Sequence, residues 1–388
     1  MNEILFVDDE PDILGGLRNA LRRQRSRWNM RFAVGGEAAL RDLEARPCDV
    51  IVSDMRMPGM DGLTLLGLMR ERHPQTARIV LSGHAELDTV VRASSVAHQY
   101  LMKPCDADTL CGAVDRALGI QALVTNPELR RVIGGLGTLP SPSATYAALT
   151  GALADPNVSI GRLAEIVRQD IGLTARALQL VNSAYCGLAQ RVTKVETAIA
   201  TLGLNMLRHL ALTVEVFRGF ADDGSTFDTL ERHAFLTARL ARRLAANQRE
   251  ADVAFAAGLL HDAGKLVLMN RAPDAYQAAA ELSFRSGISL LDAEKDSLGA
   301  THAEVGAFLL GLWDLPHAII EPVAYHHASL DRDGRRDTRS AVTFADALAH
   351  DATGGSTAEG IDQVLAEPSA FGDVARWREL ARAEARTT

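Results

Sequence analysis

Four short apolar runs, each ending in or followed by a polar residue, constrain the fold of the first 105 residues most strongly. They cover Ile4–Val7, Asp49–Asp54, Arg78–Ser82 and His98–Lys103, and amphipathic stretches such as Leu14–Leu21 lie between them. This alternation of strand and helix signals predicts a doubly wound parallel sheet. Because ligands bind at the carboxyl ends of the strands in such sheets, the polar residues there mark a candidate site.

The polar residues at these strand ends predict a cation site with phosphoryl chemistry. Asp8 and Asp9 follow the first run, Asp54 ends another, and Ser82 and Lys103 end two later ones. Converging carboxylates repel one another unless a cation lies between them, and magnesium suits oxygen ligands that a phosphate completes. A carboxylate can then attack a phosphoryl group while the metal and a lysine neutralise its oxygens.

The same residues resemble the receiver domain of two-component response regulators. The resemblance covers about residues 1–120 and rests on Phe6–Pro11, Ser53–Gly62, Leu81–Gly83 and Lys103-Pro104. It implies a five-stranded α/β receiver that accepts a phosphoryl group from a sensor histidine kinase or a phosphotransfer protein. The alternative is a receiver-like domain that has lost phosphorylation, which the intact site positions disfavour.

Roles for individual residues follow from this resemblance. Asp54 is the expected phosphoacceptor. Magnesium is expected at Asp9, Asp54 and the backbone carbonyl of Arg56, with Asp8 behind them.

Two further receiver positions are expected to contact the phosphoryl oxygens, namely Ser82 and Lys103. Tyr100 matches the aromatic residue that changes rotamer with phosphorylation. The Lys103-Pro104 peptide bond resembles one that is cis in this family, a state that X-Pro bonds tolerate. The resemblance also implies a homodimer that forms through the face carrying Tyr100 and depends on phosphorylation.

A linker helix is expected at residues 121–138. Asn126-Pro127 can open a helix that runs to about Ile133, and Gly134-Gly135 can end it. The next segment, residues 139–142, is expected to be extended because it contains two prolines.

From about residue 143 the strand signals disappear and helical periodicity dominates, which predicts an all-α domain. Histidine and aspartate side chains recur there on apolar helical stripes. Burying so many polar groups is costly unless they are paired or bind metal, and mixed nitrogen and oxygen ligands suit iron, manganese, zinc or nickel. The residues concerned are His233, His261, Asp262, His302, His326, His327 and Asp346.

This half of the chain resembles the HDOD domain, an output module related to the HD superfamily of metal-dependent phosphohydrolases. The resemblance covers roughly residues 139–345, and residues 346–388 are expected to form a helical extension and a tail. It rests on Asp170–Ala175, Leu180–Tyr185, Ala198–Gly203, Leu260–Leu266, Gly299–Gly306 and His326-His327.

The HD resemblance implies a site for one or two transition metals, bridged by Asp262, with Lys265 as a candidate catalytic residue that steadies a phosphate. Position 229 is Thr, so it adds no carboxylate for a third metal. Ala328 follows His326-His327 where related cyclic-di-GMP phosphodiesterases have a Gly-Tyr-Pro signature, which disfavours that substrate. The alternative is a hydrogen-bonded His/Asp network without metal.

Three functions therefore compete. The first is a signalling module in which phosphorylation of Asp54 controls an HDOD surface that binds a protein partner. The second is a metal-dependent phosphohydrolase that the receiver switches. The third, a DNA-binding regulator, is disfavoured because the net charge is −8 and no basic recognition helix is visible.

The composition predicts a cytoplasmic protein without a membrane segment. Four cysteines are scattered without a CxxC pair, as in reduced cytosolic proteins. The acidic start lacks a signal-peptide pattern, and no apolar run reaches the length of about 18 residues that a membrane helix needs.

Overall fold

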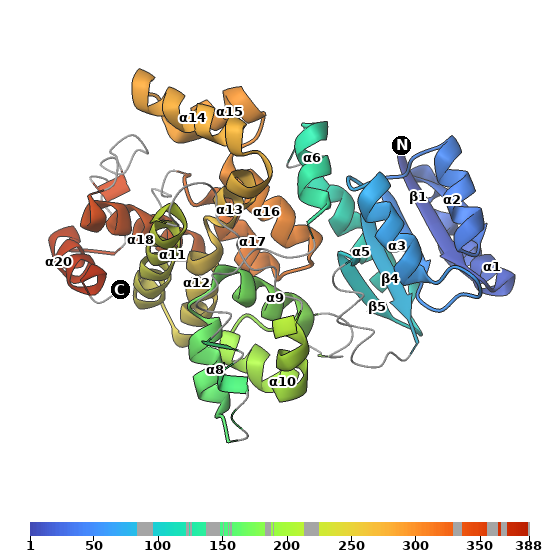
Figure 1. Ribbon diagram of the computed structural model, residues 1–388, viewed down its shortest axis with the longest axis horizontal. Helices are drawn as coiled ribbons and strands as arrows, with labels where there is room; N and C mark the ends of the chain where they lie inside the picture. The colour runs from blue at the N-terminus through green and yellow to red at the C-terminus, as the bar shows by residue number, and fades with distance from the viewer. Residues whose placement is uncertain are drawn as a thin grey trace. The chain divides into compact units, whose positions relative to one another are not determined.

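The computed structural model shows two compact units, residues 1–138 and most of residues 139–388 (Figure 1). It describes residues 1–83, 96–121, 124, 126–136, 148–149, 151–153, 155, 157–182, 188, 190–212, 225–328, 336–354, 364–365 and 371–386.

The first unit contains the predicted doubly wound sheet of five parallel strands, in the order β2-β1-β3-β4-β5. The side chains of β3 and β4 are buried along their whole length, as the continuous apolar runs indicate. The strands are β1 (Asn2–Asp8), β2 (Trp28–Val34), β3 (Val50–Asp54), β4 (Ala77–Ser82) and β5 (Gln99–Met102). The flanking helices are α1 (Pro11–Ala20), α2 (Gly36–Ala45), α3 (Gly62–Arg72) and α5 (Ala107–Gln121).

Strand β2 has no counterpart among the four apolar runs. It is an edge strand that pairs only with β1, and only Trp28 and Ala33 of its residues are buried. An edge strand that is half exposed has no need of a continuous apolar run, so its sequence gives a weak signal.

Helix α6 (Pro127–Gly134) lies within the predicted linker, and its first turn is capped as expected, because the Asn126 side chain accepts hydrogen bonds from two backbone amides. Its last residue, Gly134, lies against the start of β4. A Cβ atom at Gly134 would lie 2.1 Å from the carbonyl oxygen of Pro74, so only glycine permits this contact. The expected extended segment at 139–142 lies outside the described residues.

Two buried side chains hold the end of α6 to the sheet. The guanidinium of Arg78 donates to the Gly134 carbonyl at 2.7 Å. His98 accepts the Arg78 backbone amide on Nδ1 at 3.0 Å, and its Nε2 lies 2.9 Å from Arg78 Nη2 and 3.2 Å from the Gly134 oxygen. Burial, followed by the charge of Arg78, holds the pKa of His98 well below its usual value, so the ring is neutral.

The second unit is helical, and its described residues contain no strand, in agreement with the all-α prediction. The helices are α8 (Ile160–Val167), α9 (Ile171–Asn182), α10 (Val195–Leu212), α11 (Ser225–Leu244), α12 (Gln248–Leu260), α13 (Ala263–Arg271), α14 (Pro273–Ser286), α15 (Leu290–Leu298), α16 (His302–Leu312), α17 (His317–Tyr325), α18 (Thr338–Thr353) and α20 (Val374–Ala385).

The core of this unit lies where α11, α12, α17 and α18 pack against one another. The predicted end of the HDOD resemblance, residue 345, falls inside α18. The domain limits 1–120, 121–138, 139–345 and 346–388 stay predictions. Among the described residues, no helix combines the length and the apolar character needed to cross a membrane.

Candidate functional site

The carboxyl ends of β1, β3 and β5 bring three charged side chains together. Asp8 ends β1, Asp54 ends β3, and Lys103 follows β5 directly. The Lys103 ammonium contacts Asp8 Oδ2 at 2.7 Å and also contacts Asp54 Oδ1. The backbone amide of Arg56 donates to Asp54 Oδ2 at 2.7 Å. Asp54 therefore lies between an ammonium and a backbone donor.

Electrostatics keep this lysine charged. Burial lowers the pKa of Lys103, but its hydrogen bonds to Asp54 and Asp8 outweigh that effect and raise the pKa above its usual value. The Lys103-Pro104 peptide bond is cis, as predicted. The loop after the acceptor closes tightly, because a Cβ at Gly62 would lie 2.0 Å from the Asp54 carbonyl oxygen.

The same end of the sheet carries three other predicted receiver residues. Ser82 ends β4 and is buried, and the register places it one position beyond the partner of Asp54. Asp9 follows Asp8 and is half-buried, while Arg56 is exposed. Tyr100 lies half-buried in β5 and packs against the core.

Close helix contacts create a second site in the helical unit. A Cβ at Gly258 of α12 would lie 2.9 Å from the Cα atom of Ala238 in α11. A Cβ at Gly264 of α13 would lie 1.9 Å from the carbonyl oxygen of His302 in α16. These glycines let the backbones of separate helices touch, and so bring histidines from those helices within reach of one another.

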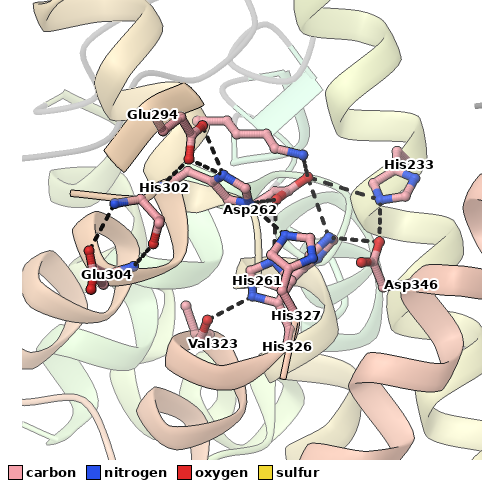
Figure 2. A network of polar contacts seen from close by, with 12 residues as sticks. His233, His261, Asp262, Glu294, His302, Glu304, Val323, His326, His327 and Asp346 are labelled. Carbon is pink, nitrogen blue, oxygen red and sulfur yellow. Dashed lines mark hydrogen bonds and ion pairs between the residues drawn. The ribbon is translucent and has the colours of Figure 1, made fainter. Parts of the chain in front are cut away.

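Asp262 lies at the centre of the histidine cluster (Figure 2). Its Oδ1 lies 3.4 Å from His302 Nε2 and 3.7 Å from His326 Nε2. Its Oδ2 lies 3.4 Å from His261 Nε2 and 4.0 Å from His233 Nε2. One carboxylate thus faces two sets of imidazoles, as a bridging ligand would.

The other predicted residues complete these two sets. Asp346 Oδ1 lies 2.9 Å from His233 Nε2 and 3.5 Å from His261 Nε2. On the other side, His327 Nε2 lies 2.9 Å from His302 Nε2. Lys265 lies 2.9 Å from Asp262 Oδ2. All seven predicted ligands therefore converge. Among the residues that the structure describes, three groups of three have donor atoms within 4.8 Å of one another. These groups are His302, His326 and His327; His233, His261 and Asp346; and His261, Asp262 and His326.

The unsatisfied atoms of this cluster fit a metal ion. His261 Nε2, His326 Nε2 and Asp262 Oδ1 are buried and lack a hydrogen-bond partner among the described residues, while Asp262 Oδ2 has the Lys265 ammonium 2.9 Å away. The Nδ1 atoms lie 2.7 Å from backbone carbonyls, those of Gly258 and Val323 respectively. A ring that donates from Nδ1 to a carbonyl presents the lone pair of Nε2, the tautomer that binds metals.

The pKa values of the cluster are also compatible with a bound metal ion. Burial lowers the pKa of His261, but Asp262 and Asp346 outweigh burial and raise it to about 10. Burial, followed by the neighbouring His327, holds the pKa of His326 well below its usual value. Burial raises the pKa of both carboxylates, yet the surrounding cations hold them well below the usual range. Both carboxylates are therefore ionised and favour positive charge on their neighbours. A metal ion can supply that charge in place of the proton on His261.

Two residues of the cluster were not predicted from the sequence. Glu294 in α15 is fully buried, accepts the His302 backbone amide at 2.8 Å, and lies 2.8 Å from His302 Nδ1. His350 Nε2 lies 3.4 Å from Asp346 Oδ1. Helical spacing could have identified both residues. Glu294 shares an apolar stripe with Leu298, and His350 follows Asp346 by one helical turn.

Family models match both units. The HDOD domain model matches residues 139–329, and the response regulator receiver domain model matches residues 4–115.

Individual relatives match parts of the chain. An uncharacterized protein of Treponema pallidum (strain Nichols) is 28% identical over 49% of this chain and 37% of its own length. The DNA-binding transcriptional regulator NtrC of Klebsiella pneumoniae is 36% identical over 41% of this chain and 32% of its own length. The chain thus spans about a third of the length of these curated relatives. The crystal structure of the MmoQ response regulator from Methylococcus capsulatus str. Bath is 24% identical, covers 62% of this chain and 98% of that one, and has a TM-score of 0.48.

Proposed function

The chain carries a response regulator receiver domain followed by an HDOD domain, and from this premise we propose that phosphorylation of Asp54 controls the HDOD domain as the output of a two-component signalling protein. The observation that carries the proposal is the position of the Asp54 carboxylate between the Lys103 ammonium and the Arg56 amide. The phosphoryl donor is a sensor histidine kinase or a phosphotransfer protein.

The residues of the acceptor site divide the chemistry among them. An oxygen of Asp54 attacks phosphorus as the bond from phosphorus to the imidazole nitrogen of the donor's phosphohistidine breaks, and the donor's histidine leaves. Lys103 and Ser82 contact the transferred phosphoryl oxygens. Asp8, Asp9 and Asp54, with the Arg56 carbonyl, would hold magnesium. When bound, magnesium neutralises charge on the phosphoryl oxygens.

The output is proposed to be a protein-binding surface of the HDOD domain. Phosphorylation of Asp54 would alter the conformation of this surface. It would also promote a homodimer through the receiver face that carries Tyr100. Light scattering of the full chain should then show a higher mass with beryllium fluoride, a phosphoryl mimic, than without it. An unchanged mass would remove the dimer from the account.

Control by the receiver is tested with hydrogen exchange of the full chain, with and without magnesium and beryllium fluoride. We expect changed exchange in α11 to α18 of the wild type and of Asp12→Asn, an exposed control. Asp54→Asn should show no change. Equal exchange in the wild type with and without the mimic would contradict control of the output by phosphorylation.

A second candidate function, a metal-dependent phosphohydrolase, is favoured by the buried unpartnered atoms around Asp262. His233, His261, Asp262 and Asp346 would hold one iron, manganese, zinc or nickel ion, and Asp262, His302, His326 and His327 a second. Such metals supply Lewis-acid polarisation of a phosphoryl oxygen. Lys265, which contacts Asp262, would neutralise charge on the phosphate.

The phosphohydrolase is tested with metal-loaded full chain and a panel of phosphodiesters and nucleotides. Hydrolysis that Asp262→Asn abolishes would support it, and a metal-loaded protein inert towards the panel would contradict it. Cyclic-di-GMP is not the expected substrate because Ala328 follows the two histidines. The DNA-binding role in the name of the Klebsiella relative is not carried over, since the match spans 32% of that protein.

A further inference from the structure

A cavity of about 480 Å³ in the helical unit is lined mainly by arginine and phenylalanine. Its walls come from the end of α8, from one face of α11 and from the facing side of α12. None of these residues belongs to the histidine cluster. The side chains that matter are Arg168, Phe235, Arg239, Arg242, Arg243 and Phe255.

The two rings form an aromatic wall backed by guanidinium groups. Phe235 and Phe255 meet edge to face, with their centroids 6.3 Å apart and their planes at 88°. The Arg168 guanidinium carbon lies 5.7 Å from the Phe255 centroid, and that of Arg239 lies 6.0 Å from the Phe235 centroid. Aromatic rings and planar guanidinium groups are the surfaces on which nucleobases stack.

The charges around the cavity do not balance. Arg168 pairs with Glu196 at 2.5 Å. Arg242 and Lys194 share Asp252, each at the long distance of 3.6 Å.

The remaining two arginines of the cavity also share one acid. Arg239 and Arg243 lie one helical turn apart and contact Glu384 of α20, at 2.9 and 2.5 Å. Among the described residues of this group, five cations therefore share three carboxylates, and an anionic ligand is favoured.

Glu384 shows how such an anion would be held. It is buried, and each of its oxygens forms an ion pair with the Nε atom of a different arginine. Arginine donors arranged in this way also suit phosphate oxygens. The carboxylate therefore occupies part of the donor set that a phosphate would use.

We propose that this cavity binds a nucleotide, with its phosphates on Arg242 and the neighbouring arginines and its base against Phe235 and Phe255. A volume of about 480 Å³ lies within the range of about 300–1,000 Å³ that is usual for small-molecule sites. Glu384 competes with the phosphates, so binding is coupled to the position of α20. The site is separate from the candidate metal centre and does not depend on the proposed output.

Calorimetric titration of the full chain with AMP, GMP, ATP and GTP tests the proposal, with adenosine, guanosine and pyrophosphate as matched probes. We expect at least one nucleotide to bind saturably, and more tightly than its nucleoside and than pyrophosphate. Arg242→Gln should weaken that nucleotide about tenfold or more. Phe235→Leu should weaken it about fivefold or more without affecting pyrophosphate. Glu384→Gln should tighten it several-fold.

Arg285→Gln, an exposed arginine in α14, is the control and should leave binding unchanged. Thermal melting of each variant shows whether it is folded, and Glu384→Gln gives a gain that misfolding cannot produce. Binding that survives Arg242→Gln but disappears in His261→Ala/Asp262→Ala would place the nucleotide at the histidine cluster and overturn the proposal. Pyrophosphate binding as tightly as every nucleotide, or no saturable binding, would also overturn it.

Discussion

Buried histidines occur in both units of the molecule, but their ring nitrogens face different surroundings. In the receiver unit, both nitrogens of His98 have protein partners, supplied by Arg78 and the Gly134 carbonyl. In the helical unit, His261 and His326 are also buried, yet within the described part of the chain only Nδ1 of each has a hydrogen-bond partner.

This difference separates a structural histidine from one prepared for a ligand. A buried polar atom without a partner costs about 1–3 kcal/mol, so several in one place need an explanation. Among the described residues, the unpartnered Nε2 atoms of His261 and His326 lie 3.4 and 3.7 Å from the two oxygens of Asp262. One or two cations bound at Asp262 would satisfy these atoms.

Replacing one histidine from each unit by leucine should give the largest contrast, measured by urea unfolding of metal-free protein. His98→Leu leaves the buried Arg78 backbone amide and the Gly134 carbonyl each without their His98 partner, and should lower the free energy of unfolding by about 3 kcal/mol. His326→Leu removes an unsatisfied polar atom, and should change it by less than about 1 kcal/mol. An equal loss of unfolding free energy in the two variants would show that the two histidines do not differ in this way.

Glu294→Gln should weaken the candidate metal site without removing a ligand. The Glu294 carboxylate fixes the orientation of His302, and loss of such a partner costs about tenfold to a hundredfold in metal affinity. Competition with a chromophoric chelator measures this affinity. Glu304→Gln, which alters a carboxylate that instead caps α16 and pairs with Lys295, is the control. A Glu294→Gln affinity equal to that of the wild type would show that His302 needs no such support.

The sequence predicted the strand ends well, because Asp8, Asp54 and Lys103 each follow a buried apolar run. The seven residues that it proposed as metal ligands lie close together, because each is on an apolar stripe where a polar group is conspicuous, and their role as ligands stays a prediction. Glu294 was missed since its role depends on α15 packing next to His302, and helical spacing does not tell which helices meet. The arginine cavity was likewise unforeseen, because its side chains come from three helices.

Gly134→Ala should release the end of α6 from the sheet. The added methyl group would meet the Pro74 carbonyl, and the contacts of the Gly134 oxygen with Arg78 and His98 would be lost. We expect a loss of about 1–2 kcal/mol in the free energy of unfolding of the receiver unit. Gly119→Ala is the control, since a Cβ there meets no atom within 4 Å. Equal stability of both variants would mean that the contact is dispensable.

The receiver unit should become less stable in acid because of His98. Its pKa is depressed in the folded state, so below the unfolded value near 6.5 the unfolded chain binds a proton that the folded chain does not. Stability should therefore fall as the pH drops below about 6.5, by at most about 1.4 kcal/mol per pH unit. His98→Asn should flatten this dependence in urea unfolding between pH 5 and pH 7. An identical slope in the variant would assign the effect to other groups.

The metal content of the purified full chain, measured by plasma mass spectrometry, most directly tests whether the histidine cluster around Asp262 is a metal site. The wild type and His317→Ala, which alters an exposed histidine of α17, should each carry about one to two equivalents of a transition metal. The variant His261→Ala/Asp262→Ala should carry almost none. Absence of metal from the wild type even after reconstitution, or equal content in both variants, would show that the histidine cluster is a buried polar network and no metal centre.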